Sequence, residues 1–296
     1  MAKKTLKKIT CTALAFASVF ACAATATACE TARPQVEMKI EFNGETYTLE
    51  YELYRKIAPT TVSHFIWLAD NGYYDGLCVH NYDYTANKMY TGGYTVSSDN
   101  DEGIAYKPYF EEIKKFDNFA DFPVSVWMNA DKTNPTYTLY GEFSSNNFRV
   151  ENGAQKQSFG SLTMYYTSKS TDEKVYASYL NEGKKGKVAS RQYKYNSATS
   201  LFYISLSEST VSTAGYCTFA TLKEDSVDVL KDFQADLNAF IEKEYGKAEE
   251  ETSAKDFVTS KIVTIHEDDP IVGETTETYK VPNSPIVIKT VKVKKY

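Results

Sequence analysis

Residues 36–54, VEMKIEFNGETYTLEYELY, decide the fold class because apolar and polar side chains alternate on both sides of a single turn. A period of two residues is typical of a half-buried β-strand. Asn43-Gly44 separates the two alternating runs, and Asn-Gly is the strongest short-range signal for a two-residue hairpin turn. We therefore expect an antiparallel pair of strands, over residues 36–42 and 46–54, at the start of the folded domain.

Two helices are predicted by apolar residues that recur at helical spacing. The first begins at Pro59 and ends at Asn71-Gly72, where glycine supplies a left-handed cap. The second covers residues 227–245 and ends at Gly246, and Ser226 is expected to cap its N-terminus. Helices of this kind bury one face, so both are expected to pack against the strands.

Further β-rich runs predict a mainly β fold. They lie at residues 161–166, 201–206, 216–222 and 285–293. Many short strands with only two helices favour a closed antiparallel barrel whose open ends the helices cover. We expect one domain, residues 36–296, with insertions near residues 95–136, 168–196 and 247–282. The third insertion is predicted to contain a hairpin around Asp268-Asp269-Pro270.

The N-terminus has the pattern of an export signal. Four lysines within the first eight residues precede an apolar run, Ile9 to Ala24, which small residues follow. This run is too short and wrongly flanked for a stable membrane span, so a transmembrane anchor is the weaker interpretation. We expect residues 1–28 to be a signal peptide and residues 29–35 to form a tether.

The end of this signal resembles a bacterial lipobox. In Ala26-Thr27-Ala28-Cys29 the cysteine would be lipidated, although Ala26 stands where Leu, Val or Ile is preferred. Cleavage by signal peptidase I after Ala26 or Ala28 and lipidation at Cys22 remain the alternatives. The protein is therefore expected to be exported, either as a cell-membrane lipoprotein facing outside the cytoplasm or in secreted form.

The charge balance excludes one class of partner and one mode of membrane binding. The whole chain carries 33 basic and 39 acidic residues, and loss of the four signal lysines leaves 29 against 39, a formal net charge of −10. Such a chain does not bind nucleic acid through phosphate neutralisation. It also repels anionic headgroups, so any membrane association is expected through the lipid anchor only.

Landmarks along the chain resemble those of bacterial cyclophilin-type peptidyl-prolyl cis-trans isomerases. The resemblance covers Val36 to Val293, interrupted by the three insertions, and it implies an eight-stranded closed antiparallel barrel with two capping helices and a peptide groove on its outer wall. The landmarks occur in the family's order: Glu52-Leu53-Tyr54, Ala58 to Phe65, Gly72 to Gly76, His80, Gly92-Gly93, Gly141-Glu142-Phe143, Gly160 to Met164, Ser197 to Ile204, Phe219 and the helix over 227–245.

The resemblance also locates a candidate site with an altered catalytic position. Prolyl isomerisation must cross a barrier of about 18–20 kcal/mol set by amide resonance. In the family an arginine donates hydrogen bonds where that resonance is lost, and Asn81 occupies the matching position here. An amide offers a neutral donor with less reach, so activity is expected to be weak. The expected substrate-binding residues are Met89, Tyr90, Thr91, Tyr165, Tyr166, Leu201, Tyr203, Val211 and Tyr216.

Tyrosine, with 24 residues, is unusually abundant, and eight tyrosines fall on segments expected to form the groove. Tyrosine gives a large contact area with a polar tip, which is typical of binding surfaces. The alternative is that half of these side chains belong to the core or the barrel wall. The eight are Tyr82, Tyr84, Tyr90, Tyr94, Tyr165, Tyr166, Tyr203 and Tyr216.

Two functions therefore remain. One is a weakly active prolyl isomerase that assists protein folding outside the cytoplasm and takes proline-containing peptide segments. The other is a catalytically inactive relative that binds a peptide, a protein or a glycan through the tyrosine-rich groove. By family we expect a monomer without a cofactor.

Other constellations indicate no further chemistry. Cys78-Val79-His80 lacks an orienting acid, so a thiol nucleophile is not expected there. His64, His80 and His266 are scattered without metal-ligand spacing, and no metal is expected. By family topology Cys78 and Cys217 both point inward, either as a disulfide or as two separate buried thiols.

Overall fold

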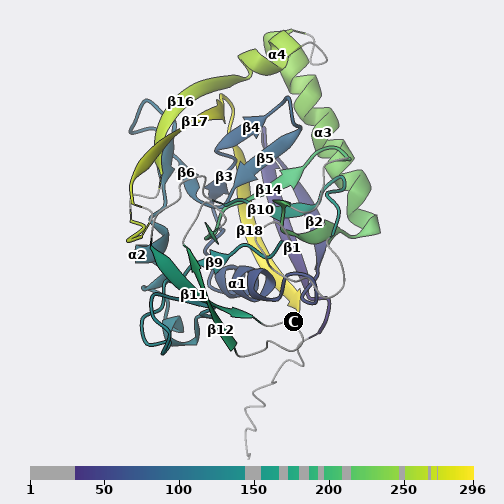
Figure 1. Ribbon diagram of the computed structural model, residues 1–296. Coiled ribbons are helices and arrows are strands. Elements are labelled where there is room, and N and C mark those ends of the chain that lie inside the picture. Colours follow the sequence, from purple (N-terminus) through teal and green to yellow (C-terminus); the bar gives the residue numbers. More distant parts are fainter. Residues whose placement is uncertain are drawn as a thin grey trace, which may run out of the picture.

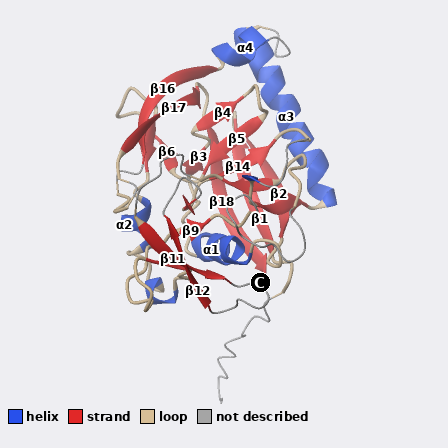
Figure 2. Ribbon diagram, in the orientation of Figure 1, coloured by secondary structure: helices blue, strands red, loops and turns tan. Residues whose placement is uncertain are grey.

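The computed structural model describes residues 31–143, 155–166, 173–179, 187–192, 197–208, 215–246, 251–265, 268–271 and 273–296. Strands dominate this part of the chain (Figures 1 and 2). The mainly β character expected from the sequence is confirmed. The expected signal peptide and Cys29 lie outside the described residues.

The main element is a curled antiparallel sheet (Figure 1). Within the described residues it contains 11 strands, in an order that runs from β4 at one end to β7 at the other. In that order the strands are β4 (Asn81–Asp83), β5 (Lys88–Thr91), β14 (Phe202–Ser205), β10 (Leu162–Met164), β15 (Thr218–Leu222), β2 (Glu45–Leu53), β1 (Gln35–Phe42), β18 (Ile286–Lys295), β3 (Leu77–Cys78), β6 (Tyr94–Val96) and β7 (Ile104–Tyr106).

This sheet corrects the expected closed eight-stranded barrel. The hairpin β6–β7 extends the sheet beyond β3, which the landmarks did not indicate. The chain between β3 and β4 changes partners within two residues: the Val79 amide donates to the Ile286 carbonyl at 2.8 Å, and the His80 amide donates to the Tyr90 carbonyl at 3.0 Å. The sheet therefore curls so that β18 and β5 flank the same short segment.

The opening hairpin forms as predicted. In β1 and β2, Phe42 pairs with Glu45 across the turn, and Asn43 and Gly44 have φ of 50° and 85°. Positive φ at both central residues is the requirement of a type I′ turn, which Asn-Gly meets at little cost. The alternation is also confirmed, because the apolar residues of β1 are buried and the polar ones are half-buried.

Both predicted helices are present. Helix α1 spans Pro59–Asp70, and Gly72 follows it with a φ of 66°. Helix α3 spans Glu224–Tyr245 and ends at Gly246, whose φ is 107°. The expected cap is wrong, since the N-cap is Lys223 and the Ser226 hydroxyl instead accepts the Glu50 amide of β2 at 2.8 Å. None of the helices in the described residues is long and apolar enough to cross a membrane.

Small sheets and short helices, most of them in the insertions, were not all expected. The small sheets are β12 (Lys187–Gln192) with β11 (Lys174–Tyr179) and β8 (Val126–Trp127), β13 (Ser197–Ala198) with β9 (Leu139–Tyr140), and β16 (Val258–Ile265) with β17 (Thr275–Pro282). The short helices are α2 (Tyr109–Ile113), a 3-10 turn (Phe119–Asp121) and α4 (Glu251–Asp256).

The hairpin β16–β17 confirms the prediction made for the third insertion and is packed onto the main sheet. Val263, Ile265, Tyr279 and Val281 of the hairpin form one buried cluster with Cys78, Tyr94 and Ile104 of the sheet. Figure 1 shows the hairpin beside β4 and β6, on the side of the molecule away from most of α3. Burial of this apolar area fixes the hairpin next to the candidate site.

Candidate functional site

Strands β4, β5 and β14 carry the candidate site, and their register decides which side chains share a face. Asn81 pairs with Tyr90, and Tyr90 pairs with Tyr203, so these three side chains project to the same side. One residue along β5, Met89 and Thr91 project to the other side, and both are fully buried. We call the side that carries Asn81, Tyr90 and Tyr203 the outer face, and the side that carries Met89 and Thr91 the inner face.

Two expected substrate-binding residues therefore need correction. Met89 belongs to the main hydrophobic core. The Thr91 hydroxyl donates to the Cys78 carbonyl at 2.8 Å, in the interior. Both were expected in the groove because the family's groove run aligns with residues 88–91, but a strand with period two cannot present the three consecutive side chains of Met89, Tyr90 and Thr91 to one surface.

On the outer face, five tyrosines form what we call the tyrosine face: Tyr90, Tyr165, Tyr166, Tyr203 and Tyr216. Tyr90 is in the centre, with its ring centroid 5.1 Å from that of Tyr203 and 5.6 Å from that of Tyr165. Tyr165 and Tyr166 lie with their rings nearly parallel, at 6.4 Å. Tyr203 is buried beneath the others, which are half-buried.

The phenol groups of Tyr90, Tyr165 and Tyr203 remain protonated and act as hydrogen-bonding groups. Burial raises the pKa of Tyr90, Tyr165 and Tyr203 far above the ordinary value. The Tyr203 hydroxyl accepts a hydrogen bond from Gln157 Nε2 at 2.8 Å. The surface is therefore apolar in area and polar at its edges, as peptide-binding surfaces commonly are.

Leu201 and the glycine pair fix the end of the site. Leu201 is half-buried and packs over Gly93, where a Cβ would clash with its side chain. Gly92 has a φ of 98°, and a Cβ there would overlap the Ser200 carbonyl. Position 92 therefore requires glycine, whereas at position 93 a Cβ would meet only the end of the flexible Leu201 side chain. The remaining expected residue, Val211, lies outside the described residues.

Of the eight candidate tyrosines, three do not belong to the tyrosine face. Tyr82 is on the inner face and packs against Phe257. Tyr94 is buried in the cluster beneath the hairpin. Tyr84 lies beside β4 with Lys280 Nζ 4.3 Å from its ring centre. The interpretation that some of these tyrosines are core residues is therefore correct for Tyr82 and Tyr94.

Asn81 is engaged by the inserted hairpin. Its Oδ1 accepts the backbone amide of Lys280 in β17 at 2.9 Å. Farther along β17, the Tyr165 hydroxyl donates to Glu277 Oε2 at 2.9 Å. Strand β17 thus contacts the site at Asn81 and at the tyrosine face. The side-chain oxygen of Asn81, the residue expected in the catalytic position, therefore already has a hydrogen-bond partner.

Two lysines stand at the site, of which Lys280 was not expected there from the sequence. Lys280 Nζ lies 3.4 Å from Asp83 Oδ1, at the end of β4. Lys88 Nζ lies 4.5 Å from the ring centre of Tyr203 and 5.4 Å from that of Tyr216. The sequence predicted a hairpin around Asp268-Asp269-Pro270, but no sequence pattern indicated that its second strand, β17, would lie against β4.

The cysteines and histidines near the site have no reactive arrangement. Cys78 and Cys217 are both free and buried, so the disulfide alternative is wrong and the separate thiols are correct. Burial raises the pKa of Cys78 to about 12 and lowers that of His80 to about 3. In the described part of the chain, no group of three or more His, Cys, Asp or Glu side chains is placed to hold a metal ion.

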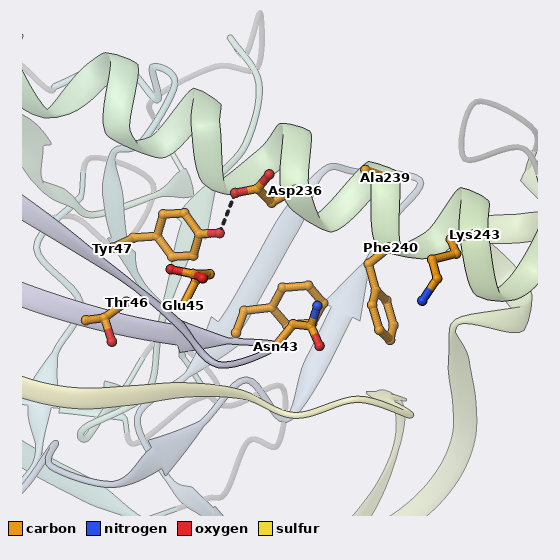
Figure 3. Close-up of a pocket in the computed structure, with 9 residues that line it drawn as sticks. Asn43, Glu45, Thr46, Tyr47, Asp236, Ala239, Phe240 and Lys243 are labelled. Atoms are coloured by element: carbon orange, nitrogen blue, oxygen red, sulfur yellow. Dashed lines mark hydrogen bonds between the residues drawn. The ribbon is translucent and has the colours of Figure 1, made fainter.

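A cavity of about 470 Å³ lies elsewhere, between the β1–β2 turn and α3 (Figure 3). There Tyr47 and Asp236 point toward each other, and the Tyr47 hydroxyl donates to Asp236 Oδ2 at 2.6 Å. Glu45 and Lys243 stand at its rim and Phe240 forms part of its wall. None of the residues expected in the groove lines this cavity, which is a separate feature of the molecule.

The family model for cyclophilin type peptidyl-prolyl cis-trans isomerase/CLD matches residues 37–263. This match spans most of the chain, and the chain therefore belongs to the cyclophilin-type peptidyl-prolyl cis-trans isomerase family. Domains of this family bind proline-containing peptide segments in general, and prolyl isomerisation is the family's reaction.

Similar solved structures include a Cryptosporidium parvum cyclophilin-type peptidyl-prolyl cis-trans isomerase. It is 13% identical, with a TM-score of 0.42, over 89% of this chain and 99% of that one. The structure in the presence of the dipeptide Ala-Pro is 12% identical, with a TM-score of 0.41, over 88% of this chain and 99% of that one. No curated protein matches the chain significantly.

Proposed function

We propose that this protein is an exported prolyl isomerase of weak activity that holds proline-containing segments against its tyrosine face. The observation that carries this proposal is the outer face itself. The half-buried Tyr165 and the buried Tyr203 pack against Tyr90 beside Asn81, and a family match covers the strands that position them. The surface is suited to hold a peptide, while the residue expected in the catalytic position is a neutral amide.

Weak turnover is expected because Asn81 is uncharged and its side-chain oxygen is already hydrogen-bonded. The isomerase must stabilise a twisted amide that has lost its resonance, and a charged, directed donor does so best in a partly dry groove. Asn81 carries no charge, and its oxygen is bound by the Lys280 amide. This hydrogen bond restrains the orientation of the whole amide, which reduces the reach of its NH₂ group toward a substrate.

The proposal is tested by NMR exchange spectroscopy on a short Ala-Pro peptide with purified protein. We expect cis–trans exchange clearly above the uncatalysed rate, yet slow at equal concentration compared with a family member that retains the arginine. Asn81→Arg is expected to increase the rate. An exchange rate equal to the uncatalysed rate at high protein concentration would reject the proposed isomerase activity.

The alternative, an inactive binder of a peptide, protein or glycan, is favoured by the contact of β17 with Asn81. Under this hypothesis peptide binding survives Asn81→Ala but is lost in Tyr90→Ala, because the tyrosine rings supply the contact area. Chemical-shift titration with the same peptide measures both variants. Equal losses in the two variants would contradict the binding-only hypothesis.

We further propose that the protein acts outside the cytoplasm as a monomer anchored by a lipid on Cys29. The support is the sequence: a basic, apolar and small-residue leader that ends in a lipobox-like Ala26-Thr27-Ala28-Cys29. Intact mass and detergent partitioning of protein from a bacterial membrane test the anchor. Cys29→Ser is expected to move the protein into the aqueous phase, and an unmodified Cys29 in the mature protein would reject the anchor.

A further inference from the structure

Lys88 is the cation that the fold places over the tyrosine face. In β5 it follows the same alternation as Tyr90, so its side chain is on the outer face. Its Nζ lies over two rings, 4.5 Å from the centre of Tyr203 and 5.4 Å from that of Tyr216. The side chain is half-buried, which holds the ammonium above the rings instead of in free solvent.

The hydrogen-bonding capacity of this ammonium is unused within the described part of the chain. There, no carboxylate forms an ion pair with Lys88, and its contacts are with aromatic rings. An ammonium has three donors, and rings do not satisfy them as oxygen atoms do. A peptide lying on the tyrosine face would therefore meet a directed cation with free donors.

The other lysine at the site is already occupied. Lys280 Nζ lies 3.4 Å from Asp83 Oδ1 and 4.3 Å from the ring centre of Tyr84. Its backbone amide is bound to Asn81. Of the two lysines, Lys88 alone combines a place over the tyrosine face with donors free for a ligand.

We propose that Lys88 is the catalytic donor of this site and does the work that the family assigns to the arginine replaced by Asn81. The inference rests on the proposed function. As the prolyl C–N bond twists, resonance is lost and the lone pair becomes localised on nitrogen. An Nζ–H of Lys88 donates a hydrogen bond to that lone pair. No covalent bond breaks and no proton is transferred.

The surroundings of Lys88 support this role. Lys88 is half-buried against the tyrosine rings, and a charged hydrogen bond is stronger where the local dielectric constant is low. Burial lowers the pKa of Lys88, while the Asp83 carboxylate opposes this change by favouring the charged form. Asp83 thus helps to keep the donor an ammonium although it pairs more directly with Lys280.

The test measures exchange in a neutral Ala-Pro peptide with the whole protein and four variants. Lys88→Met and Lys88→Gln remove the charge, Lys88→Arg keeps it, and Lys132→Met is the matched control. Lys132 also carries its ammonium over an aromatic ring, 5.1 Å from the ring centre of Trp127, but in a loop outside the tyrosine face. Denaturation midpoints confirm that each variant is folded.

We expect Lys88→Met and Lys88→Gln to lower kcat by roughly tenfold or more with KM nearly unchanged, because the donor acts on the transition state. Lys88→Arg is expected to recover most of kcat, and Lys132→Met to match the unmodified protein. A change in KM alone would assign Lys88 to binding and overturn the inference. So would wild-type kcat in both Lys88→Met and Lys88→Gln.

The outcomes separate this inference from the proposed function. If the unmodified protein does not catalyse the exchange, both the proposed isomerase activity and the role of Lys88 as its donor are rejected. An active unmodified protein that Lys88→Gln leaves fully active rejects Lys88 alone. Because two neutral variants are measured, misfolding of Lys88→Met does not leave the inference undecided.

Discussion

The inner and outer faces of strands β4, β5 and β14 differ sharply although the same short stretches of chain supply both. Inner residues such as Met89, Thr91 and Phe202 are fully buried and fixed by packing. Among the outer residues, Asn81 contacts the hairpin β16–β17, whereas Lys88 and Tyr90 lie against Tyr203. Packing therefore preserves the strand framework, while the chemistry carried on its outer surface is free to change.

The largest expected effect is on the inner face. The Phe202 ring is 5.6 Å from that of Phe65 and 5.5 Å from that of Tyr74, between centroids. Phe202→Ala is expected to lower the free energy of unfolding by about 3–5 kcal/mol through lost contacts and a cavity. Guanidinium denaturation measures it. The neighbouring outer-face change Tyr90→Ala should cost clearly less, and equal costs would contradict the distinction between the faces.

A second prediction uses two histidines in the interior, His64 and His80. Burial lowers the pKa of each to about 3, whereas an unfolded histidine titrates near 6.5. Between these values the unfolded chain binds more protons, so stability is complete above pH 6.5 and is lost as the pH falls. From pH 7 to pH 5 the free energy of unfolding is expected to fall by about 2 kcal/mol for each histidine.

His80→Phe is the control for this pH dependence, since its ring would keep the packing against Tyr94 and Tyr279. About half of the histidine-dependent loss should disappear in this variant. Glu142 acts with the opposite sign, because burial raises its pKa and its contribution weakens as the pH rises above the unfolded value. An unchanged pH profile in His80→Phe would show that His80 takes up protons in the folded protein.

The smallest effect concerns the junction between the outer face and the hairpin. Asn81→Ala removes the acceptor of the Lys280 amide and is expected to cost about 0.5–1.5 kcal/mol. Amide hydrogen exchange at Lys280 should become faster, while amides of β1 remain unaffected. Asn81→Asp keeps an acceptor oxygen and is the matched control. Protection of Lys280 that is unchanged in Asn81→Ala would mean that apolar packing alone holds β17.

Much of the framework could be predicted because its signals are local. The opening hairpin follows from Asn43-Gly44 and the alternation around it, and α1 follows from Pro59 and the apolar face after it. The third insertion also has a recognisable hairpin pattern. Partners distant in sequence gave no such signal, which is why the sheet order beyond β3 and the pairing of β8 with β11 were not expected.

The candidate site was predicted less well, because matching the sequence to the family gives the position of each residue but not the face of the strand to which its side chain points. Consecutive residues at β5 were all expected to bind substrate, yet strand geometry sends Met89 and Thr91 inward and Lys88 and Tyr90 outward. Only the contacts of Lys88 with Tyr203 and Tyr216 indicate that it is a positioned cation.

The sequence by itself determined the β-rich framework, the two long helices, family resemblance and the abundance of tyrosine, since periodicity, turn residues and composition are properties of neighbouring positions. The tertiary structure decided which tyrosines meet, that β17 binds Asn81, and that Lys88 stands over two rings without a carboxylate partner in the described part of the chain. These contacts join residues up to 199 positions apart, where register and sheet curvature, not local pattern, set the distances.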